Sequence, residues 1–325
     1  MRSRKPSGIA ARVRGLSPNA NTSSRAARAA VEDHDQHLLG IVLTAASAVA
    51  YSTSGFFTRL IHLDTWTILF WRGIFAGLFI AAFTTWQFRR DTPAAVRAIG
   101  WPGVIAAALS TLATIMYINA FRGTSVADVM VIGATIPFMT AALGWLWLRE
   151  REPWSTLLAS TVALFGAFVL IGGAVAQGHL VGDLLAVGMA FCMAIMMLII
   201  RKYRATSMLP AACLSAFLCS AVVAPVASPG AVTSVDLVYL VLFGTMQFGL
   251  GLLLLTLGTR LVSATESALM GALEAPLGPL WVWLAFGEIP SSTTWIGGGI
   301  IMGAVSAHIV TTDKLPVPQA RAHEH

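Results

Sequence analysis

The chain has 325 residues, of which 56% are hydrophobic and only 11% are charged (21 Lys or Arg and 15 Asp or Glu). Soluble domains carry about 25% charged residues, because charges cover the surface that faces water. The composition therefore excludes a soluble globular domain and predicts an integral membrane protein. The formal net charge of +6 does not indicate nucleic-acid binding, because the basic residues lie in tails and short connections and form no stripe.

Residues 1–36 form a basic tail that is rich in Ala, Ser and Arg. The tail lacks the apolar stretch of a secretory signal. We expect it to be disordered and cytoplasmic, because it has too few apolar residues to bury. An organellar transit peptide is the alternative interpretation, since such peptides are also rich in Arg and Ser and poor in acidic residues.

Ten apolar runs follow the tail, separated by polar or helix-breaking residues. A helix rises 1.5 Å per residue, so about 20 apolar residues cross a ~30 Å hydrocarbon layer. The runs cover residues 37–60, 65–86, 102–121, 125–148, 154–175, 182–200, 208–228, 237–257, 263–286 and 294–309, the last being of marginal length. We predict an all-α integral membrane protein with ten transmembrane helices.

The basic residues between the runs predict the orientation, because Lys and Arg concentrate in cytoplasmic segments. With the N-terminus inside, 18 basic residues lie in inside segments and two, Arg59 and Arg122, lie outside. We therefore expect a multi-pass protein of the cell inner (plasma) membrane. Both termini, including a C-terminal tail of residues 312–325, are expected to be cytoplasmic.

The chain matches itself at a shift of 138 residues, where seven of 35 positions are identical. An odd number of runs separates the copies, so the two halves are expected to insert in opposite directions. We predict two inverted five-helix repeats, residues 37–175 and 182–311. Such repeats are typical of transporters, because two pseudo-symmetric halves can alternate around a central site. The identical pairs are Arg122/Arg260, Ser125/Ser263, Gly133/Gly271, Ala134/Ala272, Trp145/Trp283, Leu146/Leu284 and Glu150/Glu288.

Short motifs recur in the same order in both halves. The first half has Pro137 and then Glu150-Arg151, and the second has Gly182-Asp183, Pro276 and Gly287-Glu288. In this order the chain resembles the drug/metabolite transporter superfamily, specifically its ten-helix EamA-type members. The resemblance implies a carrier of small metabolites with one cavity between the halves. It also implies a structural role for Pro137, Glu150, Arg151, Pro276, Gly287 and Glu288. The chain departs from the pattern at Arg149 and Ile289.

Two ionisable residues lie deep within apolar runs, where a charge costs ~2.5–3.5 kcal/mol. Glu274 is 14 residues from both Arg260 and Glu288, which places it near the membrane midplane. We interpret it as a proton-coupling or cation-binding site, and a structural carboxylate paired with an Arg is the alternative. Arg72 is a candidate to hold a substrate carboxylate. Alternatively, its side chain extends to the interface or braces a helix end.

Uncharged polar side chains and a methionine are further candidates to line a substrate cavity. Those of the first run recur three or four residues apart and form one stripe. Alternatively they join helices, because Ser and Thr satisfy their own backbone carbonyls. The candidates are Ser47, Tyr51, Ser54, Tyr117, Asn119, Met193 and Gln247.

The sequence thus predicts a secondary active transporter that exports a small metabolite by alternating access, with proton or solute coupling. The expected substrate is an amino acid or related compound, or an amphipathic drug. The expected partners are this substrate and the lipid bilayer, with no nucleic acid, and the protein is a monomer or a homodimer. We expect no cofactor and no metal, because Cys192, Cys213 and Cys219 lack metal-site spacing and no Walker loop is present.

Two other classes of protein remain as alternatives. A membrane-embedded enzyme would need a catalytic motif, but neither G-x-S-x-G nor H-E-x-x-H occurs, so no catalytic residue is expected. A structural or sensory membrane protein would not need inverted repeats.

Overall fold

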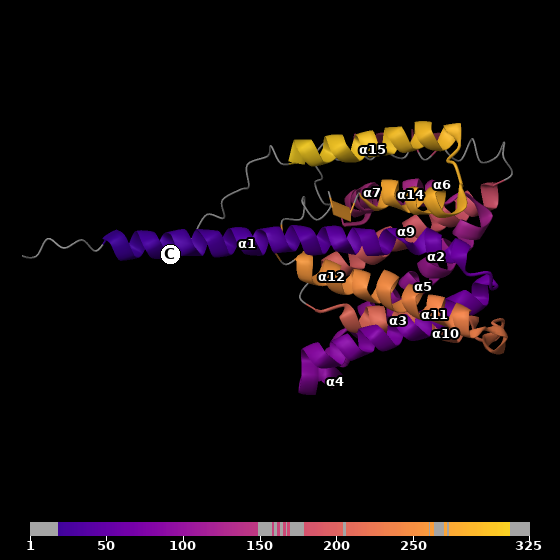
Figure 1. Cartoon of the computed structure of the whole chain (residues 1–325), viewed down its shortest axis with the longest axis horizontal. Helices are drawn as coiled ribbons and strands as arrows, with labels where there is room; N and C mark the ends of the chain where they lie inside the picture. Colours follow the sequence, from indigo (N-terminus) through magenta and orange to yellow (C-terminus); the bar gives the residue numbers. More distant parts are fainter. Residues whose placement is uncertain are drawn as a thin grey trace, which may run out of the picture.

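The chain forms a bundle of helices in this computed structural model, and the described residues contain no strand. The structure describes residues 19–148, 158, 161–162, 165–166, 168–169, 179–203, 206–259, 261–262, 270–271 and 273–312. Glu150 and Arg151 of the family motif lie outside these ranges. The long helix α1 runs along the longest axis and extends beyond the bundle, while α15 lies along one side (Figure 1).

The helices follow one another with short connections. Those of the first half are α1 (Asn19–Ser52), α2 (Ser54–Leu60), α3 (Thr65–Phe88), α4 (Thr92–Ala98), α5 (Gly100–Gly123), α6 (Val126–Gly133) and α7 (Ile136–Leu148). Those described in the second half are α9 (Leu180–Lys202), α10 (Leu209–Val223), α11 (Ser234–Leu242), α12 (Gly251–Gly258), α14 (Glu274–Phe286) and α15 (Ser292–Thr312). A π-helix, η3 (Phe243–Leu250), joins α11 to α12.

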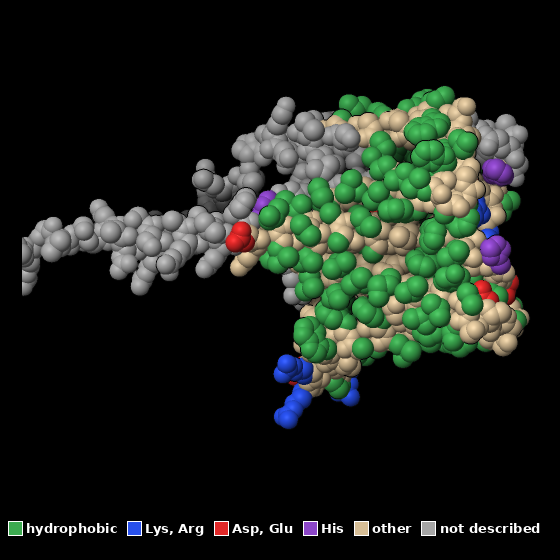
Figure 2. Space-filling view, in the orientation of Figure 1, with side chains coloured by type: hydrophobic (Ala, Val, Ile, Leu, Met, Phe, Trp, Pro, Cys, Tyr) green, Lys and Arg blue, Asp and Glu red, His purple; other side chains and the backbone are tan. Residues whose placement is uncertain are grey.

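Six described segments are long and apolar enough to cross a membrane. Figure 2 shows apolar side chains over the middle of the visible face, with charged and His side chains at its two ends. This distribution suits a multi-pass membrane protein whose sides face lipid. The count of ten helices stays a prediction, because the expected helices at residues 154–175 and 263–286 are described only in part. The six segments are Asp35–Leu60, Thr65–Ala98, Gly100–Gly123, Val126–Leu146, Leu180–Ile200 and Ser234–Gly258.

Helix α1 begins at Asn19, inside the tail that we expected to be disordered up to residue 36. The segment contains several Ala and Arg residues, which have high intrinsic helix propensity. It also continues directly into the first apolar run, so it needs no separate helix nucleus. The disordered cytoplasmic tail over residues 1–36 stays a prediction, since residues 1–18 lie outside the described part of the chain.

The first apolar run is interrupted between α1 and α2, at Thr53. The hydroxyl groups of Ser52, Thr53 and Ser54 each donate a hydrogen bond to the backbone carbonyl three residues earlier, at 2.6–2.8 Å. Such local bonds compete with the regular helical pattern and bend helices. The break therefore follows from three consecutive hydroxyl side chains.

The prolines of the family motif lie at helix starts in both halves. Pro137 is the second residue of α7, after the interruption that ends α6. Pro276 is the third residue of α14. Proline lacks the backbone N–H and restricts the residue before it, so it fits the first turn of a helix. Both halves thus contain a helix that starts within an apolar run.

The two halves of the chain pack closely where α5 meets α9. A Cβ atom on Gly182 would lie 2.6 Å from both the Gly123 carbonyl oxygen and the Thr124 nitrogen. Only two glycines facing each other allow this approach. Buried apolar residues of both halves, including Phe121, Ala186 and Phe243, extend the same core.

Gly182→Ala should destabilise the protein by about 1–3 kcal/mol, because the added methyl group overpacks the contact with Gly123. The matched control is Gly299→Ala in α15, where a Cβ would meet no atom within 4 Å. Thermal unfolding of the purified protein in lipid nanodiscs measures both changes. Equal melting temperatures for the two variants would contradict the packing described here.

Candidate functional site

Arg72 of α3 is buried in the bundle, with 5% of its surface exposed. Its Nη2 donates a hydrogen bond to Gln247 Oε1 at 3.0 Å. The guanidinium lies over the rings of Phe243 and Phe248, with Cζ 4.9 and 5.0 Å from their centroids, which favours a cation away from water. Nε has no acceptor among the described residues. The site therefore holds a buried guanidinium whose Nε donor is unused within the described residues.

The π-helix η3 supplies three of the groups around Arg72. Gln247, Phe243 and Phe248 all lie in it, and π-helical segments occur frequently at functional sites. Gly244 lets this segment approach α3, since a Cβ there would lie 2.9 Å from the Arg72 carbonyl oxygen. The irregular helix thus places an amide and two aromatic rings against one guanidinium.

Two tyrosines complete the polar cluster. Gln247 Nε2 donates to the Tyr51 backbone carbonyl at 3.5 Å, and the Tyr51 ring meets Phe248 edge to face at 6.5 Å. The hydroxyl groups of Ser54 and Tyr117 are hydrogen-bonded to each other at 2.6 Å. The cluster therefore joins α1, α2, α3, α5 and η3, next to the break in the first apolar run.

Glu274 is the first residue of α14. Its carboxylate lies within electrostatic range of Tyr51 and Tyr117, and Arg72 acts on the same two side chains. Within the described part of the chain, the Glu274 carboxylate has no hydrogen bond or ion pair. Glu274 and Arg72 thus act electrostatically on the same two tyrosines. No ion pair joins the two charged groups in the part of the chain that the structure describes.

The structure brings together six of the residues that the sequence singled out: Arg72, Gln247, Tyr51, Ser54, Tyr117 and Glu274. Ser47 is buried one helical turn before Tyr51. Met193 packs against a small core cluster that Tyr117 also borders. Asn119 donates to its own helix, at Ile115 O (2.8 Å), instead of joining the cluster. The ligand roles of all nine residues stay predictions.

Sequence reasoning missed the aromatic partners of this cluster. Phe243 and Phe248 looked like ordinary apolar residues, and nothing in their spacing marks them as cation-binding rings. Trp281 of α14 was also missed, although its indole N–H donates to Ser52 Oγ at 2.9 Å. This bond ties α14, which carries Glu274, to the break in the first run.

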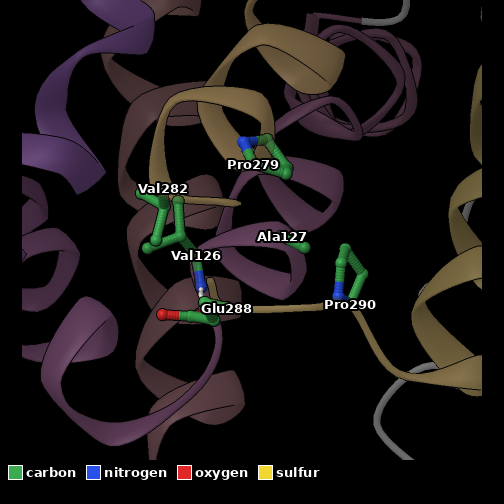
Figure 3. Close-up of a pocket in the computed structure, with 6 residues that line it drawn as sticks. All are labelled: Val126, Ala127, Pro279, Val282, Glu288 and Pro290. Carbon is green, nitrogen blue, oxygen red and sulfur yellow. Dashed lines mark hydrogen bonds between the residues drawn. The ribbon is translucent and has the colours of Figure 1, made fainter. Parts of the chain in front are cut away.

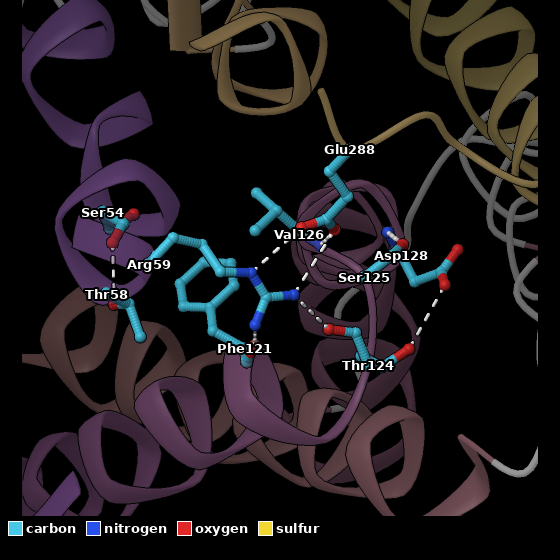
Figure 4. A network of polar contacts seen from close by, with 9 residues as sticks. All are labelled: Ser54, Thr58, Arg59, Phe121, Thr124, Ser125, Val126, Asp128 and Glu288. Carbon is cyan, nitrogen blue, oxygen red and sulfur yellow. Dashed lines mark hydrogen bonds and ion pairs between the residues drawn. The ribbon is translucent and has the colours of Figure 1, made fainter. Parts of the chain in front are cut away.

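A second polar network joins the halves at the end of the bundle where α2 and α5 end, called here the Arg59 end. Arg59 Nε is paired with Glu288 Oε2 at 3.0 Å, and each side chain is 26% exposed. The same guanidinium donates to the backbone carbonyls of Phe121 (2.6 Å) and Thr124 (3.1 Å). Figure 4 shows Arg59 pointing into the space between these groups.

Glu288 also accepts a hydrogen bond from the Val126 N–H at 2.9 Å. Val126 is the first residue of α6, and a carboxylate is favoured at a helix N-terminus. Gly287, with φ 70°, ends α14 in the left-handed conformation and turns the chain toward this contact. The motif Gly287-Glu288 of the second half thus caps a helix of the first half.

The space beside Glu288 is a shallow indentation with no room for a water molecule (Figure 3). Ligand pockets usually exceed ~300 Å³, so the indentation is too small for a substrate. The halves are therefore closed against each other here. It is lined by Val126, Ala127, Pro279, Val282, Glu288 and Pro290.

A double-mutant cycle with Arg59→Met and Glu288→Gln tests the bond between the halves. We expect a coupling of about 0.5–3 kcal/mol, because the side chains share one network. Chemical unfolding of the four proteins in the same detergent provides the measurement. Glu288→Gln keeps an acceptor for the Val126 N–H, so it isolates the charge from the helix cap. Additive effects of the two changes would refute the coupling.

Comparisons with known proteins match this architecture. The EamA-like transporter family matches the chain twice, over residues 38–172 and 180–309. No curated protein matched. One solved crystal structure is similar to this chain, with a TM-score of 0.58 and 17% sequence identity. The matched region covers 88% of this chain and 99% of the chain in that structure. At this identity the likeness shows a shared fold alone.

Proposed function

Because the chain belongs to the EamA-like transporter family, we propose that it is a secondary active transporter that exports a small zwitterionic metabolite by alternating access. Family membership confirms the resemblance to the drug/metabolite transporters and fits a transporter better than an enzyme. The proposed substrate is an amino acid or a related compound. The single observation that carries this proposal is that Arg72 and Glu274 both act electrostatically on Tyr51 and Tyr117, while no ion pair joins them within the described residues.

A zwitterion complements this arrangement. A charge buried in the bundle is costly unless it is paired or hydrogen-bonded. In our proposal a substrate carboxylate binds Arg72, whose Nε lacks an acceptor within the described residues. The substrate ammonium group binds Glu274, and the rest of the substrate packs on Tyr51 and Tyr117. Each substrate charge then neutralises one protein charge.

The amphipathic drug expected as an alternative substrate fits less well. A cationic drug would pair with Glu274 and pack on the aromatic rings. It would leave the Arg72 guanidinium with only Gln247 and its two ring contacts. The surplus positive charge in the bundle disfavours this ligand.

In our proposal, alternating access depends on the two repeats, the Arg59–Glu288 network and the interrupted helices. The two inverted repeats, residues 37–175 and 182–311, rock against each other around the Arg72 site. We propose that the Arg59 end lies outside the cell, as the count of basic residues predicts. The network of Arg59 and Glu288 then keeps this end closed while substrate enters from the cytoplasm. The interrupted helices at Thr53 and Pro137 supply the hinges, since discontinuous helices form substrate sites in many transporters.

A ligand series that removes one substrate charge at a time tests the zwitterion proposal. Purified protein is heated with individual amino acids, with their carboxamides and with their N-acetyl forms. A bound amino acid should raise the melting temperature, because saturation at ~100 times the Kd contributes ~2.7 kcal/mol. The carboxamide lacks the group for Arg72 and the N-acetyl form lacks the group for Glu274, so neither should act.

Two variants assign the charges. Arg72→Gln should lose the preference for the free carboxylate, and Glu274→Gln should lose the preference for the free ammonium group. Asn119→Ala is the matched control, because Asn119 bonds within its own helix. The proposal fails if amino acids and their uncharged derivatives stabilise the protein equally.

A further inference from the structure

Asp183 presents a buried carboxylate that the proposed transport site does not use. It lies in the first helical turn of α9 and has no exposed surface. Neither of its carboxylate oxygens has a hydrogen-bond donor within the part of the chain that the structure describes. An ionised carboxylate without donors is unfavourable in the interior of a protein. A positively charged ligand would therefore stabilise the Asp183 carboxylate.

A second buried carboxylate, Asp128 of α6, lies close by and is fully hydrogen-bonded. Its Oδ2 accepts from the Thr124 hydroxyl at 3.2 Å, and its Oδ1 accepts from the Thr294 hydroxyl at 2.5 Å. Asp128 acts electrostatically on Asp183, and Thr124 lies beside both carboxylates. A hydroxyl has one hydrogen, and Thr124 gives it to Asp128 (Figure 4).

We propose that Asp183 is a proton-binding site, in which the Asp128–Asp183 pair holds one proton on Asp183 while the Arg59 end is closed. Two carboxylates that share a dry site cannot both be ionised without a large repulsion. Asp128, with two donors, is the better anion. Asp183, with none, is the better acid.

The other charged and titratable groups around Asp183 do not decide which of the two carboxylates holds the proton. His179 precedes the same helix and acts electrostatically on Asp183. Arg59 donates to the Thr124 carbonyl and is paired with Glu288. On α5, Arg122 donates hydrogen bonds to the backbone carbonyls of Ile61 and Leu63, at 3.0 and 2.9 Å. The hydroxyl group of Tyr117, also on α5, is hydrogen-bonded to the Ser54 hydroxyl group. The described helix α7, which also packs on α9, carries no ionisable side chain.

A proton suits the site better than a metal ion. A bound sodium ion needs several oxygen lone pairs directed at one point. Both threonine hydroxyls instead point their hydrogens at Asp128. A proton on Asp183 requires no further ligand, because it converts the carboxylate into a neutral acid.

The site is assembled from both halves of the chain. Thr124 and Asp128 come from the first half, and Asp183 and Thr294 from the second. The close approach of Gly123 and Gly182 brings Asp183 against Thr124. Separation of the halves at this end would hydrate both carboxylates and release the proton. Proton binding is thereby linked to closure of the Arg59 end, independently of which substrate occupies the Arg72 site.

Infrared difference spectroscopy of the full-length protein in phosphatidylcholine vesicles tests this site without a substrate. A protonated carboxyl group has a carbonyl band distinct from that of a carboxylate. To remove the contribution of Glu274, spectra of Glu274→Gln are compared with those of Glu274→Gln/Asp183→Asn. The first protein should show the protonated band at neutral pH, and the second should lose it. Asn replaces the neutral acid with a group of the same shape, so the fold is expected to persist.

Asp128→Asn in the Glu274→Gln background keeps the test decisive if the Asp183 variant does not fold. Removal of the neighbouring charge should move the loss of the protonated band to lower pH. An unchanged band in both variants, or no band at neutral pH before either change, would overturn the proposal. A band present in potassium buffer and abolished by sodium would also overturn it, in favour of a sodium site. None of these outcomes depends on amino-acid binding at Arg72.

Discussion

The buried Arg72 guanidinium is the constraint around which the described bundle is organised. A charge within a membrane-spanning helix is costly, so its neighbours must stabilise it. Gln247 supplies one acceptor at 3.0 Å, and Phe243 and Phe248 supply ring faces. These groups require the π-helical turn of η3, and Gln247 in turn contacts the Tyr51 carbonyl of α1. One cation thus fixes how three segments meet.

The proposed transporter has three pairs of charged residues along the bundle, and each pair has a separate role. Arg72 and Glu274 act electrostatically on the same two tyrosines and are assigned to the substrate. Arg59 and Glu288 join the halves at one end, where a carboxylate of the second half caps α6 of the first. Asp128 and Asp183 lie near that junction and are assigned to a proton. A movement that opens the Arg59 end would therefore disturb both networks there together.

Much of this could be predicted from the sequence, because an ionisable residue in an apolar run is conspicuous. Arg72 and Glu274 were identified in this way. The sequence placed Pro137 within one continuous apolar run, and the helix start there is seen only in the structure. Asp128 and Asp183 obey the same rule, but they lie near the starts of their runs, where an acidic residue resembles an ordinary helix end. The partners of Arg72 could not be predicted, because Gln247 is 175 residues away in the chain. The break at Thr53 depends on hydroxyl bonds that the apolar pattern does not reveal.

We propose that Arg72 and Glu274 bind the two charges of one substrate. Because burial without a hydrogen bond disfavours a charged carboxylate, we further propose that Glu274 holds a proton in the empty site and that the substrate ammonium group displaces it. Proton release on substrate binding can be measured for this exchange. An amino acid that stabilises the protein is added to a weakly buffered sample, and a pH indicator records the protons released. We expect proton release from the wild-type protein, and weakened binding with no release from Glu274→Gln. Equal release from both proteins, or substrate binding to the wild type with no release, would contradict it.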